Sequence, residues 1–238
     1  MAKERLDKLI ASTGRWSRRE VKTLVREGRV LVDGRIAGSA EEKYDAESCR
    51  IAVNGEELLL RRHTYVMLHK PAGVLSATED GRGRTVLDLL TPELRKIGVF
   101  PVGRLDKDTE GLLLLTDDGE LAHALLSPKK HVDKVYYARV SGRLTHEDCA
   151  AFEAGMTLGD GLECLPAGLE ILAAGETSEC LVTLREGKFH QVKRMLAARG
   201  KPVEYLKRLS MGSLRLDDTL APGEFRLLTA AEEAQLQR

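Results

Sequence analysis

The stretch Gly103-Arg104-Leu105-Asp106-Lys107-Asp108-Thr109-Glu110-Gly111 leads directly into Leu112-Leu113-Leu114-Leu115 and then into Thr116-Asp117-Asp118-Gly119. Four leucines between two turn-forming segments predict a short strand that is buried on both faces. The charged loop before them therefore holds a carboxylate at the rim of a rigid core element, where a reactive group can be positioned accurately. The sequence predicts a functional site at this loop.

A calcium loop is one alternative for the same residues. Asp106, Asp108 and Glu110 before Gly111, with Asp117 further along, superficially match a loop of the EF-hand kind. Such a loop needs an amphipathic helix on each side, and a run of leucines does not suit its second half. The composition alone also allows a plain acidic surface turn before a core strand.

The overall composition is that of a globular protein. The chain has 238 residues, of which 42% are hydrophobic and 31% are charged, and this length allows two domains. No apolar run approaches the ~20 residues that span a bilayer, and the charged N-terminus does not resemble a signal peptide. The four cysteines are widely spaced and form no C-x-x-C pair, so we expect neither a metal site nor disulfides. Free thiols are typical of a cytoplasmic protein.

The charge is unevenly distributed although the totals cancel, with 37 Lys and Arg against 37 Asp and Glu. Residues 1–35 contain ten basic and five acidic side chains, an excess of five (10 − 5). Such a basic segment on a nearly neutral body indicates a nucleic-acid partner.

The N-terminal segment predicts two helices and a hairpin. Apolar residues at helical spacing run from Arg5 to about Thr13, and the capping box Ser17-Arg18-Arg19-Glu20 predicts the start of a second helix. Asp33-Gly34 between two apolar segments is a strong hairpin signal. This pattern resembles the S4 RNA-binding domain, which implies a small S4-type domain of residues 1–60. Five basic residues on its polar side would contact RNA phosphates, unless they form only a solvated helix face: Arg15, Arg18, Arg19, Lys22 and Arg26.

Three further motifs complete a second resemblance. The chain contains, in this order, the K-P-x-G turn at 70–73, G-R-L-D at 103–106 followed by T-x-G-L-L-L-L-T at 109–116, a K-x-Y element at 134–136 and E-G-K-x-H-Q-V-K-R-M at 186–195. They resemble the RsuA branch of the ribosomal RNA pseudouridine synthases, and the likeness extends from Arg5 to Leu228. It implies an α+β fold in which residues 61–238 form a catalytic domain on a mixed, mostly antiparallel sheet.

The resemblance also implies roles for individual residues. Asp106 would be the catalytic nucleophile, and Lys193 would pair with it and favour its ionised form. Tyr136 would stack on the target base, which must leave its own stack to reach the carboxylate. Arg104 would contact the RNA or fill the vacated space. Most relatives outside this branch have arginine at the position of Lys193, so a bidentate contact is not expected here.

Neighbouring residues are expected to be structural. Alternation along the predicted strand 134–140 places Tyr137 opposite Tyr136, and we expect Tyr137 in the core. His190 has no partner cysteine or serine motif, so we expect a hydrogen-bonded structural histidine. Residues 86–90 predict a short helix that ends near Pro92, and residues 120–126 predict another helix.

Pseudouridine formation is redox-neutral, and the sequence has no metal, nucleotide or flavin motif, so no cofactor and no metal are expected. The expected substrate is one uridine of 16S ribosomal RNA in a partly assembled small subunit, modified by a monomer in the cytoplasm without membrane contact. Two alternatives remain: a sister enzyme that acts on 23S ribosomal RNA, and a non-catalytic S4-type assembly factor.

Overall fold

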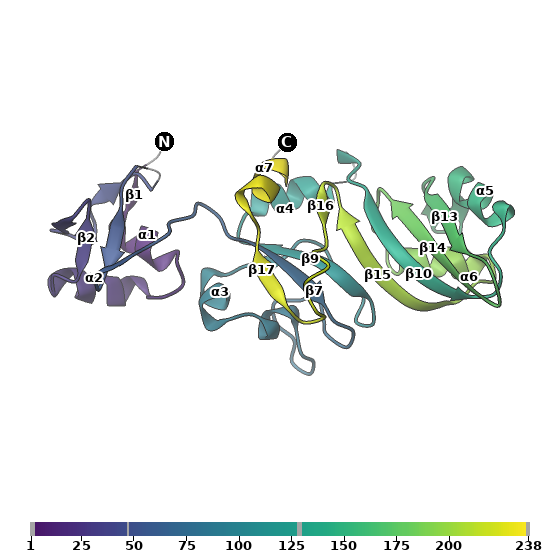
Figure 1. Cartoon of the computed structure of the whole chain (residues 1–238), viewed down its shortest axis with the longest axis horizontal. Helices are drawn as coiled ribbons and strands as arrows, with labels where there is room; N and C mark the ends of the chain where they lie inside the picture. The colour runs from purple at the N-terminus through teal and green to yellow at the C-terminus, as the bar shows by residue number, and fades with distance from the viewer. Residues whose placement is uncertain (1–2, 47, 128–129, 237–238) are drawn as a thin grey trace. The chain divides into compact units, whose positions relative to one another are not determined.

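The computed structural model describes residues 3–46, 48–127 and 130–236. The chain divides into two compact units (Figure 1). One comprises Met1–Thr64 and Leu90–Val99, and the other comprises Tyr65–Leu89 and Phe100–Arg238. Each unit has its own hydrophobic core.

The first unit packs two helices, α1 (Leu6–Ala11) and α2 (Arg18–Arg26), with short strands. One sheet has the order β3 (Arg35–Ile36), β2 (Val30–Val32), β5 (Ile51–Val53) and β6 (Glu56–Glu57), while β1 (Glu4–Arg5) pairs with β4 (Lys43–Tyr44). Apolar side chains of both helices and of the central strands are fully buried, including Leu6, Ile10, Val21, Val30 and Ile51. Burial of these faces stabilises helices that are too short to form alone.

Two local predictions for this unit are confirmed. The Ser17 hydroxyl accepts a hydrogen bond from the Glu20 amide, and the Glu20 carboxylate accepts one from the Ser17 amide, so the capping box starts α2. Asp33 and Gly34 have φ of 50° and 77°, and they join the antiparallel strands β2 and β3. These positive φ values are those required by a two-residue hairpin turn.

The second unit is built on a large sheet, visible across the second unit in Figure 1. Its main path runs β13 (Gly168–Ala173), β14 (Thr177–Leu184), β10 (Lys134–Ser141), β15 (Val203–Met211), β9 (Glu110–Thr116), β7 (Tyr65–Lys70) and β17 (Phe225–Leu227). Off this path, β16 (Leu214–Arg215) pairs with β15, and β8 (Phe100–Pro101) pairs with β9. The β9–β15 pair is parallel and the other pairs are antiparallel. The predicted α+β fold with a mixed, mostly antiparallel sheet is confirmed.

The leucine run is the buried strand that the sequence predicts. Leu112–Leu115 are fully buried in β9, between β7 and β15. Gly111 has φ of 104°, and a Cβ there would lie 2.2 Å from the Arg208 carbonyl oxygen, so the two backbones meet where a side chain has no room. Because residues 110–116 form a strand, the loop before them does not lead into the helix that an EF-hand requires.

The remaining elements of the second unit are short: η1 (Val86–Leu89), α4 (Gly119–Leu126), α5 (His146–Ala154), β11 (Met156–Thr157), β12 (Glu163–Cys164), α6 (Gln191–Ala198) and α7 (Ala230–Leu236). Helix α3 (Pro92–Ile97) belongs to the first unit. The short helix predicted from residues 86–90 is the 3-10 helix η1, which ends at Leu89, before Pro92. Pro92 itself begins α3 after its N-cap Thr91, and this second helix was not predicted. Proline suits the first turn of a helix, where its missing N–H has no intrahelical partner.

The prediction that Tyr137 of β10 lies in the core is wrong. Burial alternates along the strand as expected, but Lys134, Tyr136 and Ala138 lie on the buried face. Tyr137 is half-buried on the other face, with its ring edge-on to Tyr205 at 6.0 Å between centroids. Alternation assigns residues to two faces, but it does not show which face of a mixed apolar and polar strand is covered.

Candidate active site

The loop before β9 is held in place by Lys70, at the end of β7. Its Nζ donates hydrogen bonds to the carbonyl oxygens of Pro71, Asp106, Lys107 and Thr109, at 3.0, 3.0, 3.2 and 2.8 Å. The side chain is fully buried, and this burial lowers the pKa of Lys70 to about 8 although the nearby carboxylates oppose the shift. One ammonium group thus ties the backbone of the loop to the neighbouring strand.

A second set of contacts fixes the residues on either side of Asp106. The Ser76 hydroxyl accepts from the Leu105 amide at 3.1 Å and donates to the Leu105 carbonyl at 2.9 Å. The Gly73 amide donates to the Lys107 carbonyl at 2.7 Å. The backbone is therefore anchored immediately before and immediately after Asp106, which limits the positions that its carboxylate can take.

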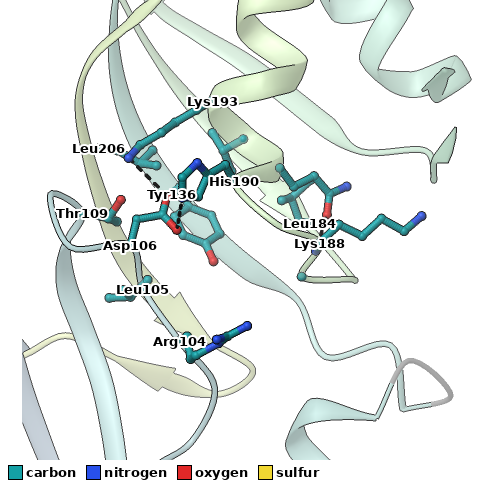
Figure 2. Close-up of a pocket in the computed structure, with 13 residues that line it drawn as sticks. Arg104, Leu105, Asp106, Thr109, Tyr136, Leu184, Lys188, His190, Lys193 and Leu206 are labelled. Carbon is teal, nitrogen blue, oxygen red and sulfur yellow. Dashed lines mark hydrogen bonds and ion pairs between the residues drawn. The ribbon is translucent and has the colours of Figure 1, made fainter. Parts of the chain in front are cut away.

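The Asp106 carboxylate faces two basic side chains of the segment that starts α6 (Figure 2). Its Oδ2 lies 3.1 Å from Lys193 Nζ, and its Oδ1 lies 3.5 Å from His190 Nε2. Lys193 Nζ also contacts Asp108 Oδ1 at 2.5 Å, and this hydrogen bond lowers the pKa of the Asp108 carboxyl group. Lys193 therefore acts as a single point charge between two carboxylates, in keeping with the expectation that it makes no bidentate contact.

Tyr136 lies in the same pocket as this ion pair. The pocket wall combines Asp106 with Tyr136 of β10, Leu184 of β14, Leu206 of β15 and Lys193 of α6 (Figure 2). The structure thus brings together the three residues predicted to be catalytic, and the exposed Arg104 lines the pocket as well. A carboxylate, a cation and an aromatic ring between apolar walls can hold a flat base and act on its sugar bond.

Several residues of the site were not singled out from the sequence. His190 was expected to be a hydrogen-bonded structural residue, but it is exposed, has φ of 51° and lies beside Asp106. Thr109 is buried in the pocket wall, and its hydroxyl has no hydrogen-bond partner among the described residues. The K-P-x-G motif marked the turn at Lys70, but nothing in the sequence indicated that four carbonyl groups converge on its ammonium.

The basic residues predicted to bind RNA in the first unit are all exposed, and several make ion pairs with acidic side chains. Arg15 pairs with Glu56 at 2.6 Å, Arg18 with the buried Asp7 at 3.1 Å and Lys22 with Glu41 at 3.2 Å. Arg26 bonds the Lys22 carbonyl and the Thr23 hydroxyl, and Arg19 lies exposed on α2. Pairs between two exposed side chains, as in Arg15–Glu56 and Lys22–Glu41, are weak, so phosphate groups can compete for these cations.

Among the described residues, no cluster of three or more His, Cys, Asp or Glu side chains is arranged to hold a metal ion. In the same described part of the chain, no helix has the length and apolar character needed to cross a membrane.

Comparisons with known proteins identify the family of the chain. The model of the family described as RNA pseudouridylate synthase matches residues 64–198, and the S4 domain model matches residues 4–48. The chain is 50% identical to the uncharacterized RNA pseudouridine synthase YtzG of Bacillus subtilis, over 96% of both chains. It is 40% identical to ribosomal small subunit pseudouridine synthase A of Vibrio cholerae, over 98% of this chain and 99% of the relative.

Two further similarities extend over nearly the whole chain. Ribosomal large subunit pseudouridine synthase B of Bacillus subtilis is 39% identical, over 98% of this chain and 96% of the relative. A crystal structure described as pseudouridylate synthase superimposes with a TM-score of 0.68 at 35% identity, covering 98% of this chain and 99% of the other. Family, fold and motif order agree, and the chain belongs to the RNA pseudouridylate synthases that carry an N-terminal S4 domain.

Proposed function

We propose that this chain converts one uridine of 16S ribosomal RNA into pseudouridine, with Asp106 as the catalytic nucleophile. The observation that carries the proposal is the Asp106 carboxylate, 3.1 Å from Lys193 Nζ in a pocket that Tyr136 also lines. Asp106 supplies the oxygen nucleophile of the reaction, and the neighbouring ammonium group orients its carboxylate in the pocket. Residues 1–60 act as the S4-type domain and residues 61–238 as the catalytic domain.

The reaction breaks the bond between uracil N1 and ribose C1′, turns the base and forms a bond between C5 and C1′. The C5 proton is lost, and N1 gains a proton, so the atoms balance without an external group. Tyr136 stacks on the uracil ring, and Lys193 stabilises the negative charge on Asp106. Three routes are compatible with this arrangement: attack of Asp106 on C1′, its addition to the base, and loss of a ribose proton to form a glycal.

RNA binding is divided between the two units in this proposal. Arg15, Arg18, Arg19, Lys22 and Arg26 contact phosphates through the S4-type domain, which gives affinity and register rather than sequence choice. Arg104, exposed at the pocket, contacts RNA beside the flipped uridine or occupies the space that the uridine leaves. The enzyme acts as a monomer in the cytoplasm, on RNA of a partly assembled small subunit.

A second substrate has specific support. The identity to the large subunit enzyme, 39%, is almost the same as the identity to the small subunit enzyme, 40%. The chemistry at Asp106 would be unchanged with 23S ribosomal RNA, so the substrate rather than the site separates the two proposals.

Pseudouridine mapping of 16S and 23S ribosomal RNA tests both. Cells that lack the protein are complemented with the wild type or with Asp106→Asn. We expect one 16S position to lose its modification and to regain it only with the wild type. Loss of pseudouridine at a 23S position instead would show that the substrate is the RNA of the large subunit. Unchanged pseudouridine at every position, with an assembly defect that Asp106→Asn corrects, would leave only the non-catalytic assembly factor.

A further inference from the structure

Phe189 occupies an unusual position beside the active site. Its side chain is 72% exposed, and among the described Phe, Trp and Tyr residues it alone is exposed. Because most of this side chain is in contact with solvent, the hydrophobic effect does not account for a phenylalanine at this position. Its ring stacks on the ring of His190, with centroids 3.8 Å apart and planes 17° apart. His190 in turn lies 3.5 Å from Asp106, so one residue separates Phe189 from the carboxylate.

The loop that carries Phe189 is held by a buried amide. The Gln191 side chain accepts from the Lys188 amide at 3.0 Å and donates to Glu186 Oε1 at 2.5 Å. The Gln191 and Glu186 side chains are buried, and Glu186 Oε1 also accepts from the Leu165 amide at 2.9 Å. Hydrogen bonds on both sides of Phe189 therefore hold the backbone that presents its ring.

We infer that Phe189 stacks on an unpaired RNA base next to the target uridine. One face of its ring is covered by His190, and its high exposure leaves the other face available to a planar ligand. When a uridine is extruded into a pocket, its neighbours lose stacking partners. Aromatic side chains replace such partners in RNA-binding proteins, with a preference for single-stranded bases. Arg104, exposed at the same pocket, provides charge for the adjoining phosphates.

This inference rests on the proposed reaction at Asp106 and adds to it a subsite for a flanking nucleotide. Because stacking tolerates any base, Phe189 contributes affinity and position rather than base identity. Loss of one base–aromatic stack is expected to weaken RNA binding about 10- to 100-fold, which corresponds to about 1.4–2.8 kcal/mol.

The test uses unmodified transcripts of whole 16S and 23S ribosomal RNA as probes. Dissociation constants are measured for Phe189→Ala, Phe189→Leu and Phe189→Trp, each combined with Asp106→Asn to prevent turnover. Leu172→Ala is the matched control, since Leu172 is an exposed apolar residue of β13 that does not line the pocket. Stacking predicts weaker binding with Ala and Leu, binding within about threefold of the parent with Trp, and no change for the control.

A spectroscopic readout separates stacking from a structural effect. The chain has one tryptophan, Trp16, so the indole added by Phe189→Trp is measured against the parent protein. Quenching of this added fluorescence by RNA supports a base on the ring. Equal RNA affinities for the Ala, Leu and Trp variants would overturn the inference, as would an unquenched indole.

Failure of the proposed reaction gives a different result. If the wild type released no tritium from C5-labelled uridine in either RNA, as a free transcript or in partly assembled subunits, the reaction at Asp106 would be refuted. The binding constants and the indole signal would still decide whether Phe189 stacks on RNA, because neither depends on turnover.

Discussion

Replacement of Lys70 by methionine should reduce activity far more than stability. The change keeps a flexible side chain in the buried site, but it removes the ammonium that donates to four carbonyl oxygens of the loop and its neighbour. Two of these acceptors keep another donor, since the Asp106 carbonyl also accepts from the Thr109 amide and the Lys107 carbonyl from Gly73. The carbonyl groups of Pro71 and Thr109 lose their bond to Nζ.

Two opposing contributions determine the effect on stability. A buried carbonyl left without its donor costs about 1–3 kcal/mol, so two of them cost about 2–6 kcal/mol. Against this, the pKa of Lys70 falls from 10.5 to about 8, and methionine avoids the corresponding charge burial of about 3 kcal/mol at ~1.36 kcal/mol per pKa unit. The net loss of stability is therefore between about −1 and 3 kcal/mol, a decrease in Tm of no more than about 12 °C.

For activity, no favourable contribution offsets the loss of the Lys70 ammonium group. The loop released by Lys70→Met carries Asp106, and a displacement of about 1 Å at a reacting group lowers rates about 100-fold. Single-turnover tritium release from C5-labelled RNA and a thermal melt measure the two quantities, with Lys201→Met as a control outside the pocket lining. A Lys70→Met enzyme with wild-type turnover would refute the reasoning, as would a loss of activity that only follows loss of folded protein.

The lowered pKa of Lys70 also predicts opposite effects of pH on activity and stability. As pH rises through about 8, the folded protein loses the proton that holds the loop, so activity should fall on the alkaline side. Between pH 8 and 10.5 the unfolded chain binds more protons at this group than the folded chain, so its contribution to stability rises with pH. Lys70→Met should lack this alkaline decrease in its residual activity, and a decrease that persists unchanged would assign it to another group.

Two further substitutions test the geometry of the sheet and the site. Gly111→Ala should destabilise the second unit by about 3 kcal/mol or more in a denaturant titration, because the added Cβ would lie 2.2 Å from the Arg208 carbonyl oxygen. Gly119→Ala is the control and should be nearly neutral, since the space around Gly119 is open. Lys193→Met should lower single-turnover rates about 10- to 100-fold by removing the cation beside Asp106, and Lys193→Arg should keep more activity; equal rates for the two variants would exclude a charge-based role.

Motifs and turn residues predicted much of the fold because their conformations are determined locally. The leucines of β9, the capping box at Ser17 and the hairpin at Asp33-Gly34 all follow from short-range patterns. Strand β15 was not predicted, although it lies at the centre of the sheet. It contains the almost fully buried Arg208, whose Nε donates to the Leu112 carbonyl at 2.8 Å, and such a charged residue obscures the apolar alternation of a buried strand.

Only part of the candidate site could be predicted, because some of its contacts join residues that lie far apart in the sequence. Family motifs identified Asp106, Tyr136 and Lys193, and the structure places them in one pocket. The role of Lys70 depends on carbonyl groups about 40 residues away along the chain, which no local pattern shows, as in its bond to Thr109. The position of His190 depends on the left-handed backbone before α6, which a family motif does not display.

The most direct test of the proposed mechanism is tritium release from unmodified 16S and 23S RNA labelled at uridine C5, both as free transcripts and in partly assembled subunits. The wild type and Asp106→Asn are compared at equal concentration. Loss of the C5 proton accompanies each isomerisation, so the released label counts turnovers. The mechanism predicts stoichiometric release from one site of 16S ribosomal RNA by the wild type and none by a folded Asp106→Asn protein. Release by Asp106→Asn at the wild-type rate would contradict it.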